Sequence, residues 1–397
     1  MKQQSKALHL AHIVDLRVIG GIERMAQAFV SALPEHQHSL VVFDRQLHPS
    51  INQNLAHLPN VNIISSKHWG MLRLPKSWRT WRRNQIISAL APDAIINWSQ
   101  IIDMRAFQKP VVFYEHGSAW EVFDENVLAA CYDKVHHGIA VSHAAKRMLQ
   151  LHHGFGHDID VVHNTVLQTP DIQAQARHLP VTRPFVLGAA GRLVGRKNFG
   201  VLIAAVAQLN KQGVSVHLKI AGDGPQRASL QQWIAHLNVS QQVTLLGHVH
   251  DMADFYQSID VFVCPSIWES YGLVAIEAFA HGVPVVGAAC DGLVEVVKNG
   301  VNGLVVKPTW NEKQATEQLS GLAAFESSVS YDAQTDRLQA PHSMSVEQLS
   351  IALSKLLQDA SLYEHLSLGA LQTAKDIKSF NRLVAEVVES VKKAIDA

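Results

Sequence analysis

Two glutamates stand eight residues apart in the segment 266–277, which directly follows a short apolar run. Glu269 falls in a predicted loop, and Glu277 falls inside the apolar helix that Gly272 opens. A carboxylate on an apolar helix is costly without hydrogen-bond donors, and ribose or sugar hydroxyls are suitable donors. A buried Arg or a backbone N–H group would serve equally well, and the spacing favours neither alternative. The free N–H groups at the helix start attract phosphate.

A second cluster, residues 188–198, also follows a predicted strand and leads into a helix. Gly191 allows close backbone approach, and the cations of Arg192 and Lys197 are placed to flank a diphosphate. The alternative is a pair of surface cations. That alternative is weakened because cations are disfavoured beside a helix N-terminus unless an anion is also bound there. The pattern matches neither of the common glycine-rich nucleotide motifs.

Three weaker signals also follow predicted strands. Gly222 lies in the tight loop 220–225, and Gly20 and Gly21 begin the first predicted helix. His116 comes at the carboxyl end of a strand in the first sheet, where open parallel sheets bind their ligands. A structural role for this histidine is as well supported as a functional one.

The elements that must position these residues alternate between strand and helix, which predicts α/β architecture with parallel sheets. A first series has strands over 8–14, 39–43, 61–64, 94–98, 111–114 and 137–141. A second has strands over 185–188, 216–220, 243–246, 261–264, 283–287 and 303–306. The polar, proline-containing stretch 165–184 between them is a predicted linker. Residues 308–344 show no obvious strand, and helices are predicted over 345–357 and 381–394.

The composition is that of a chain with a sizeable core: 397 residues, 47% hydrophobic and 17% charged. This excludes disorder, collagen and coiled coil as the dominant state. Three cysteines without paired spacing argue against a disulfide framework or a structural metal site, and favour a cytoplasmic location. No run of residues has the length of a membrane-spanning helix. Formal net charge is zero, but residues 1–110 hold 13 basic and 6 acidic residues, which suggests an anionic partner for this part.

Together these motifs resemble the retaining glycosyltransferases of family 4, which have the GT-B fold. The resemblance depends on the joint order of several motifs, which is more specific than any one of them. These motifs are Gly20-Gly21, Arg192 and Lys197, the 222–225 loop, and Glu269 and Glu277. The resemblance implies two Rossmann-like doubly wound domains facing an interdomain cleft. The predicted domains are 1–168 for the acceptor, a linker over 169–184, 185–378 for the nucleotide sugar, and a C-terminal helix, 379–397, that packs back on the first domain.

The resemblance also implies roles for individual residues. Arg192 and Lys197 would hold the diphosphate, Glu277 the ribose and Glu269 the donor sugar. His116 would lie near the transferred sugar and the acceptor. The remaining expected donor-binding residues are Gly20, Gly21, Gly191, Gly222, Val249, Ser270, Tyr271, Gly272, Leu273 and Val274. Asp291-Gly292 stands where many members have a glycine pair, so the identity of the sugar is not implied.

The expected reaction is transfer of a sugar, with retained configuration, from a nucleotide-diphosphate donor to a lipid-linked or lipopolysaccharide-type acceptor. A UDP-sugar is the preferred donor, and neither a metal nor a cofactor is expected, because fixed cations and helix N–H groups stabilise the leaving diphosphate. Front-face attack is favoured because no residue is clearly placed as a nucleophile. The alternatives are a sugar-nucleotide epimerase of the same fold and a catalytically silent nucleotide-sugar-binding subunit.

Residues 45–92 contain no acidic residue, and three tryptophans are interleaved with their cations. On the helix predicted here, four of these cations fall on one stripe. This pattern favours contact with an anionic membrane surface, on the inner face of the cytoplasmic membrane, or with an anionic lipid-linked acceptor. The alternative is a solvated helix face whose tryptophans pack on the sheet. Nucleic acid is not expected, because no recognised module accompanies the patch. The cations assigned to this surface are Lys67, Arg73, Lys76, Arg79, Arg82 and Arg83.

Overall fold

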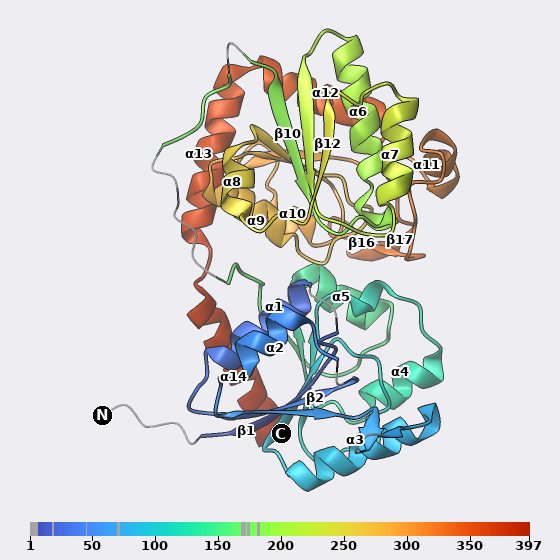
Figure 1. The fold of residues 1–397 in the computed structure, drawn as a ribbon, viewed down its shortest axis with the longest axis vertical. Coiled ribbons are helices and arrows are strands. Elements are labelled where there is room, and N and C mark those ends of the chain that lie inside the picture. The colour runs from blue at the N-terminus through green and yellow to red at the C-terminus, as the bar shows by residue number, and fades with distance from the viewer. Residues whose placement is uncertain are drawn as a thin grey trace. The chain divides into compact units, whose positions relative to one another are not determined.

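The structure is a computed structural model that describes residues 7–17, 20–44, 46–69, 72–167, 172, 175–180 and 183–397. The side chains of residues 69, 72, 73, 76 and 77 are outside the description. The chain forms two compact units, one of Met1–His163 with Ser379–Ala397 and one of Asn164–Lys378. Each unit contains its own parallel sheet with helices packed against it (Figure 1). The predicted α/β class with two Rossmann-like halves is confirmed.

The first unit is built on a parallel sheet of seven strands in the order β3-β2-β1-β6-β7-β8-β9. Its strands are β1 His9–Val14, β2 Gln37–Val42, β3 Val61–Ser65, β6 Ala94–Trp98, β7 Val111–Glu115, β8 His137–Ala140 and β9 Ile159–Val161, and a small hairpin pairs β4 His68–Trp69 with β5 Leu72–Arg73. Its helices are α1 Gly21–Ser31, α2 Pro49–Leu55, α3 Lys76–Leu90, α4 Glu125–Tyr132, α5 His143–Leu151 and α14 Phe380–Asp396. The sequence predicts every strand of this sheet except β9, which has only three residues.

The second unit is built on six parallel strands in the order β12-β11-β10-β13-β14-β15. These strands are β10 Phe185–Ala190, β11 Val216–Ala221, β12 Val243–Gly247, β13 Val261–Cys264, β14 Val285–Ala288 and β15 Gly303–Val306. Its helices are α6 Phe199–Lys211, α7 Arg227–His236, α8 Met252–Gln257, α9 Leu273–Ala280, α10 Leu293–Val296, α11 Glu312–Gln318, α12 Val346–Gln358 and α13 Ala360–Asp376. All six strands are predicted by the sequence, whereas α13 is not.

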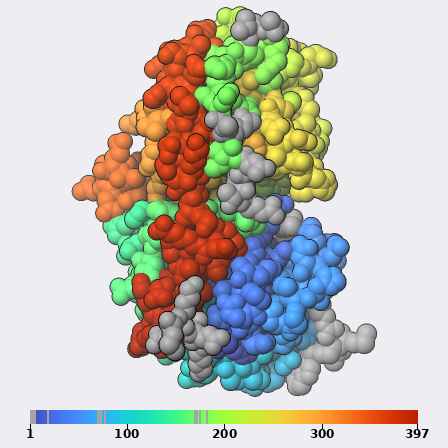
Figure 2. Space-filling view, turned by 90° about the vertical axis from the view of Figure 1, so that its left-hand side faces the viewer, coloured from blue at the N-terminus to red at the C-terminus, as the bar shows by residue number. Residues whose placement is uncertain are grey.

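The C-terminal helix α14 belongs to the first unit, although it follows the last residue of the second. Its apolar residues recur at helical spacing and are buried: Leu383, Val384, Val387, Val391 and Ala394. Figure 2 shows the outer face of this helix, in dark red, at the surface. The helix is also held by polar contacts, because Ser390 Oγ donates to Asp160 Oδ2 at 2.7 Å and Lys393 Nζ lies 2.8 Å from the same oxygen.

One stretch differs from its prediction. Residues 308–344 are not free of regular structure, because they contain α11 and a two-stranded hairpin of β16 Ser330–Asp332 and β17 Arg337–Gln339. The predicted linker lies partly outside the described residues, at 169–171, 173, 174, 181 and 182. Where it is described, Arg177 anchors it to the second unit by donating to the carbonyl oxygens of His281, Ile259 and Tyr256. Among the described residues, no helix is long and apolar enough to span a bilayer.

Candidate functional site

The strand order of the second sheet reverses between β10 and β13, and ligands of open α/β sheets bind at the carboxyl ends of the strands beside such a reversal. The loop after β10 contains Gly191, Arg192 and Lys197. The loop after β13 contains Glu269 and leads to Gly272 at the start of α9. The sheet therefore brings together the two clusters that the sequence singles out.

Lys197 and Glu269 form an ion pair between these two loops. Only 16% of the lysine side chain and 14% of the glutamate side chain are exposed. Ser266 Oγ also lies 3.4 Å from the Glu269 carboxylate. The side chain of Arg192, in contrast, is exposed. One predicted diphosphate-binding cation thus contacts the predicted sugar-binding carboxylate, and the other faces solvent.

The loops after β10 and β11 pack backbone against backbone. Gly222 has a φ of +132°, and a Cβ atom added to it would lie 1.9 Å from the carbonyl oxygen of Gly191. Gly222 N also donates to Gly247 O, at the end of β12, at 2.7 Å. Only glycine fits such an approach. Val249, predicted to contact the donor, follows in the next loop and is half-buried.

Helix α9 begins beside Glu269 with Gly272 as its N-cap, at a φ of +102°. Leu273 and Val274 are its first two residues, so their N–H groups belong to the turn that lacks intrahelical partners. Ser270 and Tyr271 precede the cap and are half-buried. This places the predicted phosphate-binding amides at the same edge of the sheet as the ion pair.

Glu277 lies in α9 and is half-buried. It accepts a hydrogen bond of 2.7 Å from the hydroxyl group of Tyr256, which comes from α8. Burial raises the pKa of Tyr256, and the neighbouring Glu277 charge raises it further. The sequence allowed a buried Arg, a backbone N–H group or a ligand as the donor to Glu277. Tyr256 was not expected, because its spacing from Glu277 carries no motif.

His116 follows β7 in the first unit and is buried, with 8% of the residue exposed. Its ring packs on Tyr114, with centroids 4.2 Å apart, and on Trp98, at 5.7 Å. Burial lowers the pKa of His116 to about 3, so the ring is neutral at physiological pH. Its Nε2 atom has no hydrogen-bond partner among the residues that the structure describes. A neutral ring with an unused nitrogen is suited to a hydrogen bond with a ligand.

The backbone around His116 is fixed by Glu115, which the sequence analysis did not single out. The Glu115 carboxylate accepts hydrogen bonds from the Ser118 hydroxyl and from the backbone N–H groups of Gly117 and Ala119. Burial raises the pKa of Glu115 to about 7, although these hydrogen bonds lower it. The other two predicted residues of this unit, Gly20 and Gly21, lie at the exposed start of α1, and Gly20 is its N-cap.

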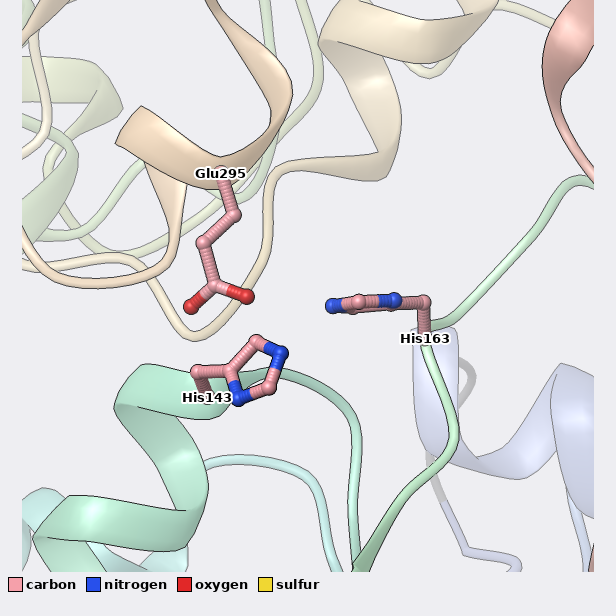
Figure 3. A group of neighbouring side chains, drawn as sticks. All are labelled: His143, His163 and Glu295. Carbon is pink, nitrogen blue, oxygen red and sulfur yellow. The ribbon is translucent and has the colours of Figure 1, made fainter.

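Two histidines of the first unit meet without any sequence signal. His143 is the first residue of α5 and His163 follows β9, and their ring centroids are 5.4 Å apart in an edge-on arrangement. Figure 3 shows the two rings. Glu295, drawn with them, belongs to α10 of the second unit.

The basic stretch of the first unit does not form the predicted stripe. Arg83 is buried, donates to the carbonyl oxygen of Asp103 at 3.1 Å, and has its pKa lowered by burial to about 10. Lys67 forms an ion pair with Asp44. The prediction of a surface cation is wrong at Arg83, because only 5% of this residue is exposed. The side chains of Arg73 and Lys76 lie outside the description.

The tryptophans of α3 also differ from the alternative in which they pack on the sheet. Trp78 is 56% exposed and Trp81 is 47% exposed. Arg79, between them, donates from Nε to the carbonyl oxygen of Leu74 at 3.1 Å. The helix therefore presents two large aromatic side chains at the surface.

Both halves of the chain match known families. The family "Glycosyl transferases group 1" matches residues 171–326, and "Glycosyltransferase Family 4" matches residues 19–166. The lipopolysaccharide core biosynthesis glycosyltransferase LpsE of Rhizobium meliloti is 39% identical over 127 residues, which are 32% of this chain and 36% of LpsE. D-inositol 3-phosphate glycosyltransferase of Mycobacterium marinum is 36% identical over 172 residues, 41% of this chain and 36% of that protein. The chain thus spans about a third of the length of these curated relatives.

Among solved structures, Anabaena HepE in complex with UDP and glucose superposes with a TM-score of 0.72 at 19% sequence identity. The superposition covers 97% of this chain and 99% of HepE. At this identity the likeness shows the fold, and it extends through both units. The two family matches together with this fold show that the chain belongs to glycosyltransferase family 4 and has the GT-B fold.

Proposed function

We propose that the protein transfers a sugar from a nucleoside-diphosphate sugar, with retention of anomeric configuration, to a lipid-linked or lipopolysaccharide-type acceptor. The observation that supports this most strongly is the Lys197–Glu269 ion pair at the reversal of the second sheet. It joins a cation suited to a diphosphate with a carboxylate suited to sugar hydroxyls. Two relatives are named for lipopolysaccharide core biosynthesis and for D-inositol 3-phosphate, and these names support an acceptor that reacts through a hydroxyl group.

In the proposed reaction the donor diphosphate lies against Arg192, Lys197 and the amides of Leu273 and Val274. Negative charge grows on the phosphate oxygen as the glycosidic bond breaks, and these fixed positive groups stabilise it without a metal. The acceptor hydroxyl attacks from the same face and passes its proton to the departing phosphate. Glu277 binds the ribose and Glu269 binds the sugar. UDP is the proposed nucleotide, and HepE, whose structure contains UDP and glucose, supports that choice.

The first unit is proposed to bind the acceptor. It has a pocket of about 340 Å³ beside β2, β3 and α3, and its polar lining includes Asn52, Ser65, His68 and Arg82. Pockets of this size accept small ligands. His116 is assigned to the sugar being transferred, where a neutral, buried ring donates or accepts one hydrogen bond.

The test is a transfer assay with purified protein, a panel of UDP-, GDP- and ADP-sugars and lipid-linked acceptors, with the anomeric configuration of the product read by NMR. Retention of configuration is expected. An inverted product would refute the front-face mechanism. Interconversion of free nucleotide sugars without acceptor would favour the epimerase, and binding without turnover of any donor would favour a silent subunit.

A further inference from the structure

Residues 322–344 belong to the stretch 308–344, which shows no obvious strand in the sequence, and they contact three loops of the second unit. The segment begins after α11 and contains the hairpin of β16 and β17. Its turn is ordered by its own side chains, because Asp332 accepts hydrogen bonds from Gln334 N at 2.9 Å and from the Thr335 hydroxyl at 2.8 Å. We refer to residues 322–344 as the bracing segment.

Both ends of the bracing segment are fixed to the loops after β10 and β11. Near its start, a Cβ atom added to Gly195 would lie 2.1 Å from the Cβ of Ala324, so the two backbones touch. Gln226 Nε2 donates to Leu322 O at 2.9 Å. At its end, Ser343 Oγ accepts from Asn198 Nδ2, the neighbour of Lys197, at 2.7 Å.

The middle of the bracing segment holds the loop after β14. Tyr331 N donates to Asp291 Oδ1 at 2.7 Å. Asp291 is 1% exposed and has a φ of +39°, a left-handed conformation that strains most side chains. A buried carboxylate is costly unless donors reach it, so this hydrogen bond helps to keep the loop in place.

The loop that Asp291 holds is bound in turn to the loop of Glu269. Gly292 N donates to Glu269 O at 3.0 Å, and Cys290 Sγ lies 3.5 Å from Ser266 O. A Cβ added to Gly272 would lie 2.7 Å from Leu293 Cδ1, so the start of α9 packs on the same loop. A continuous chain of contacts thus runs from Tyr331 through Asp291 and Gly292 to Glu269.

We propose that Asp291 is a positioning residue through which the bracing segment determines which donor sugars the protein accepts. This rests on the proposed function, in which Glu269 binds the sugar of a nucleoside-diphosphate donor. The Tyr331–Asp291 bond acts on the loop that is bound to the loop of Glu269. The loop of Lys197, which binds the nucleotide in the proposed function, is held separately by the contacts of Ala324 and Ser343. Loss of the Tyr331–Asp291 bond therefore changes discrimination between sugars more than affinity for the nucleotide.

The bond is removed from either side by Asp291→Ala and by Tyr331→Pro, and Asp291→Asn retains an acceptor oxygen. Tyr331→Ala is the matched control for Tyr331→Pro, because it removes the side chain, with its bond to Asp336, and keeps the N–H group. Isothermal titration measures dissociation constants of UDP, GDP and ADP and of UDP-glucose, UDP-galactose, GDP-mannose and ADP-glucose for the full chain. The key quantity is the ratio between each sugar donor and its parent nucleotide.

Asp291→Ala and Tyr331→Pro are expected to change this ratio by about tenfold or more, because small displacements of binding groups have effects of that size. The affinity of these two variants for the free nucleotides should stay within about threefold of wild type. In Asp291→Asn and Tyr331→Ala, the ratio between sugar donor and nucleotide should also stay within about threefold of wild type, which allows for the usual scatter of such measurements. Unchanged ratios in both bond-breaking variants would overturn the proposal. If Asp291→Ala does not fold, Tyr331→Pro alone decides in the same way.

Hydrogen exchange separates this inference from the proposed function. The Tyr331 amide of the unliganded wild-type protein is expected to exchange slowly and to lose protection in Asp291→Ala. Fast exchange in the wild type would overturn the bracing contact whatever the protein binds. A different result separates the two proposals: Tyr331 is protected, but no nucleotide or nucleotide sugar binds the wild type. In that case the proposed function and the sugar discrimination are both refuted, whereas the Tyr331–Asp291 hydrogen bond is confirmed.

Discussion

Lys197 and Glu269 form an ion pair across the point where the strand order of the second sheet reverses, although 72 residues separate them in the sequence. Both side chains are largely shielded from solvent. In the proposed complex the lysine turns toward a diphosphate and the glutamate toward a sugar. The pair therefore holds two ligand-binding groups at the site before the donor arrives, which lowers the cost of ordering them on binding.

Replacement of Lys197 by Met is expected to weaken UDP binding by about ten- to a hundredfold, the range for lost hydrogen bonds to a charged group. Lys211→Met is the matched control, because Lys211 is an exposed cation at the end of α6 in the same unit. Isothermal titration with UDP measures both. Equal affinities in the two variants would remove Lys197 from the diphosphate site.

Gly222→Ala is expected to lower the free energy of unfolding by about 2 kcal/mol or more, because it combines a strained φ with overlap onto the Gly191 carbonyl. Gly213→Ala is the comparison, since its φ of +83° is also left-handed but no atom lies within 4 Å of an added Cβ. It should cost about 1 kcal/mol. Urea denaturation provides both values. If Gly222→Ala costs no more than Gly213→Ala, the close approach of the two loops is not rigid.

A chain of neutral histidines in the first unit predicts acid sensitivity. Trp98 Nε1 donates to His12 Nδ1 at 3.2 Å, His12 Nε2 lies 2.9 Å from His38 Nδ1, and His38 Nε2 lies 3.1 Å from Leu33 O. This order requires both rings to be neutral. Burial lowers the pKa of His38 to about 4 and that of His12 well below its usual value.

His12 and His38 bind protons near pH 6.5 in the unfolded chain but not in the folded protein. Their contribution to the free energy of unfolding is therefore fully present above pH 6.5. It falls as the pH drops from 6.5 to 4. His38 alone should contribute a loss of about 3 kcal/mol. His38→Gln should show a smaller fall over this window in urea denaturation at fixed pH values. A variant whose stability declines as steeply as that of the wild type would show that these rings do not control the acid response.

The exposed tryptophans of α3 predict membrane contact by the first unit. We expect the wild type to float with anionic vesicles and less with neutral ones, and Trp78→Ser/Trp81→Ser to float less in both cases. Leu368→Ser, an exposed apolar residue of α13 in the second unit, is the control. If the wild type floats with neither anionic nor neutral vesicles, the predicted membrane contact is refuted.

The strand pattern was predictable because each strand of both sheets, except β9, is an apolar run bounded by loop residues. Strand β9 has three residues, Ile159–Val161, which is too short for a periodic signal. Helix α13 escaped prediction although Asp359 caps it, because it follows α12 almost directly and no turn residue separates the two. In the β16–β17 hairpin, Ser330 and Tyr331 are buried, but both strands are short and mostly polar and β17 is largely exposed, so hydrophobic alternation does not mark the hairpin.

The site was predictable only as separate clusters. Loops after parallel strands share one edge of the sheet, which is why Lys197 and Glu269 were expected near each other. Their direct pairing, and the bonds of Tyr256 to Glu277 and of Tyr331 to Asp291, depend on tertiary contacts between distant residues. The burial of Arg83 was not predicted for the same reason, since helical spacing does not say which cation of a helix other parts of the chain will bury.

We propose that the second unit binds a nucleoside diphosphate through Arg192 and Lys197. Thermal unfolding of the wild type and of Arg192→Ala/Lys197→Ala, each with UDP, GDP, ADP and their sugars, tests it most directly. A ligand at a hundred times its dissociation constant adds about 2.7 kcal/mol of stability. A raised Tm is expected for the wild type with at least one nucleotide, and no rise is expected for the double variant. Equal rises in both proteins, or none in the wild type with any nucleotide, would contradict it.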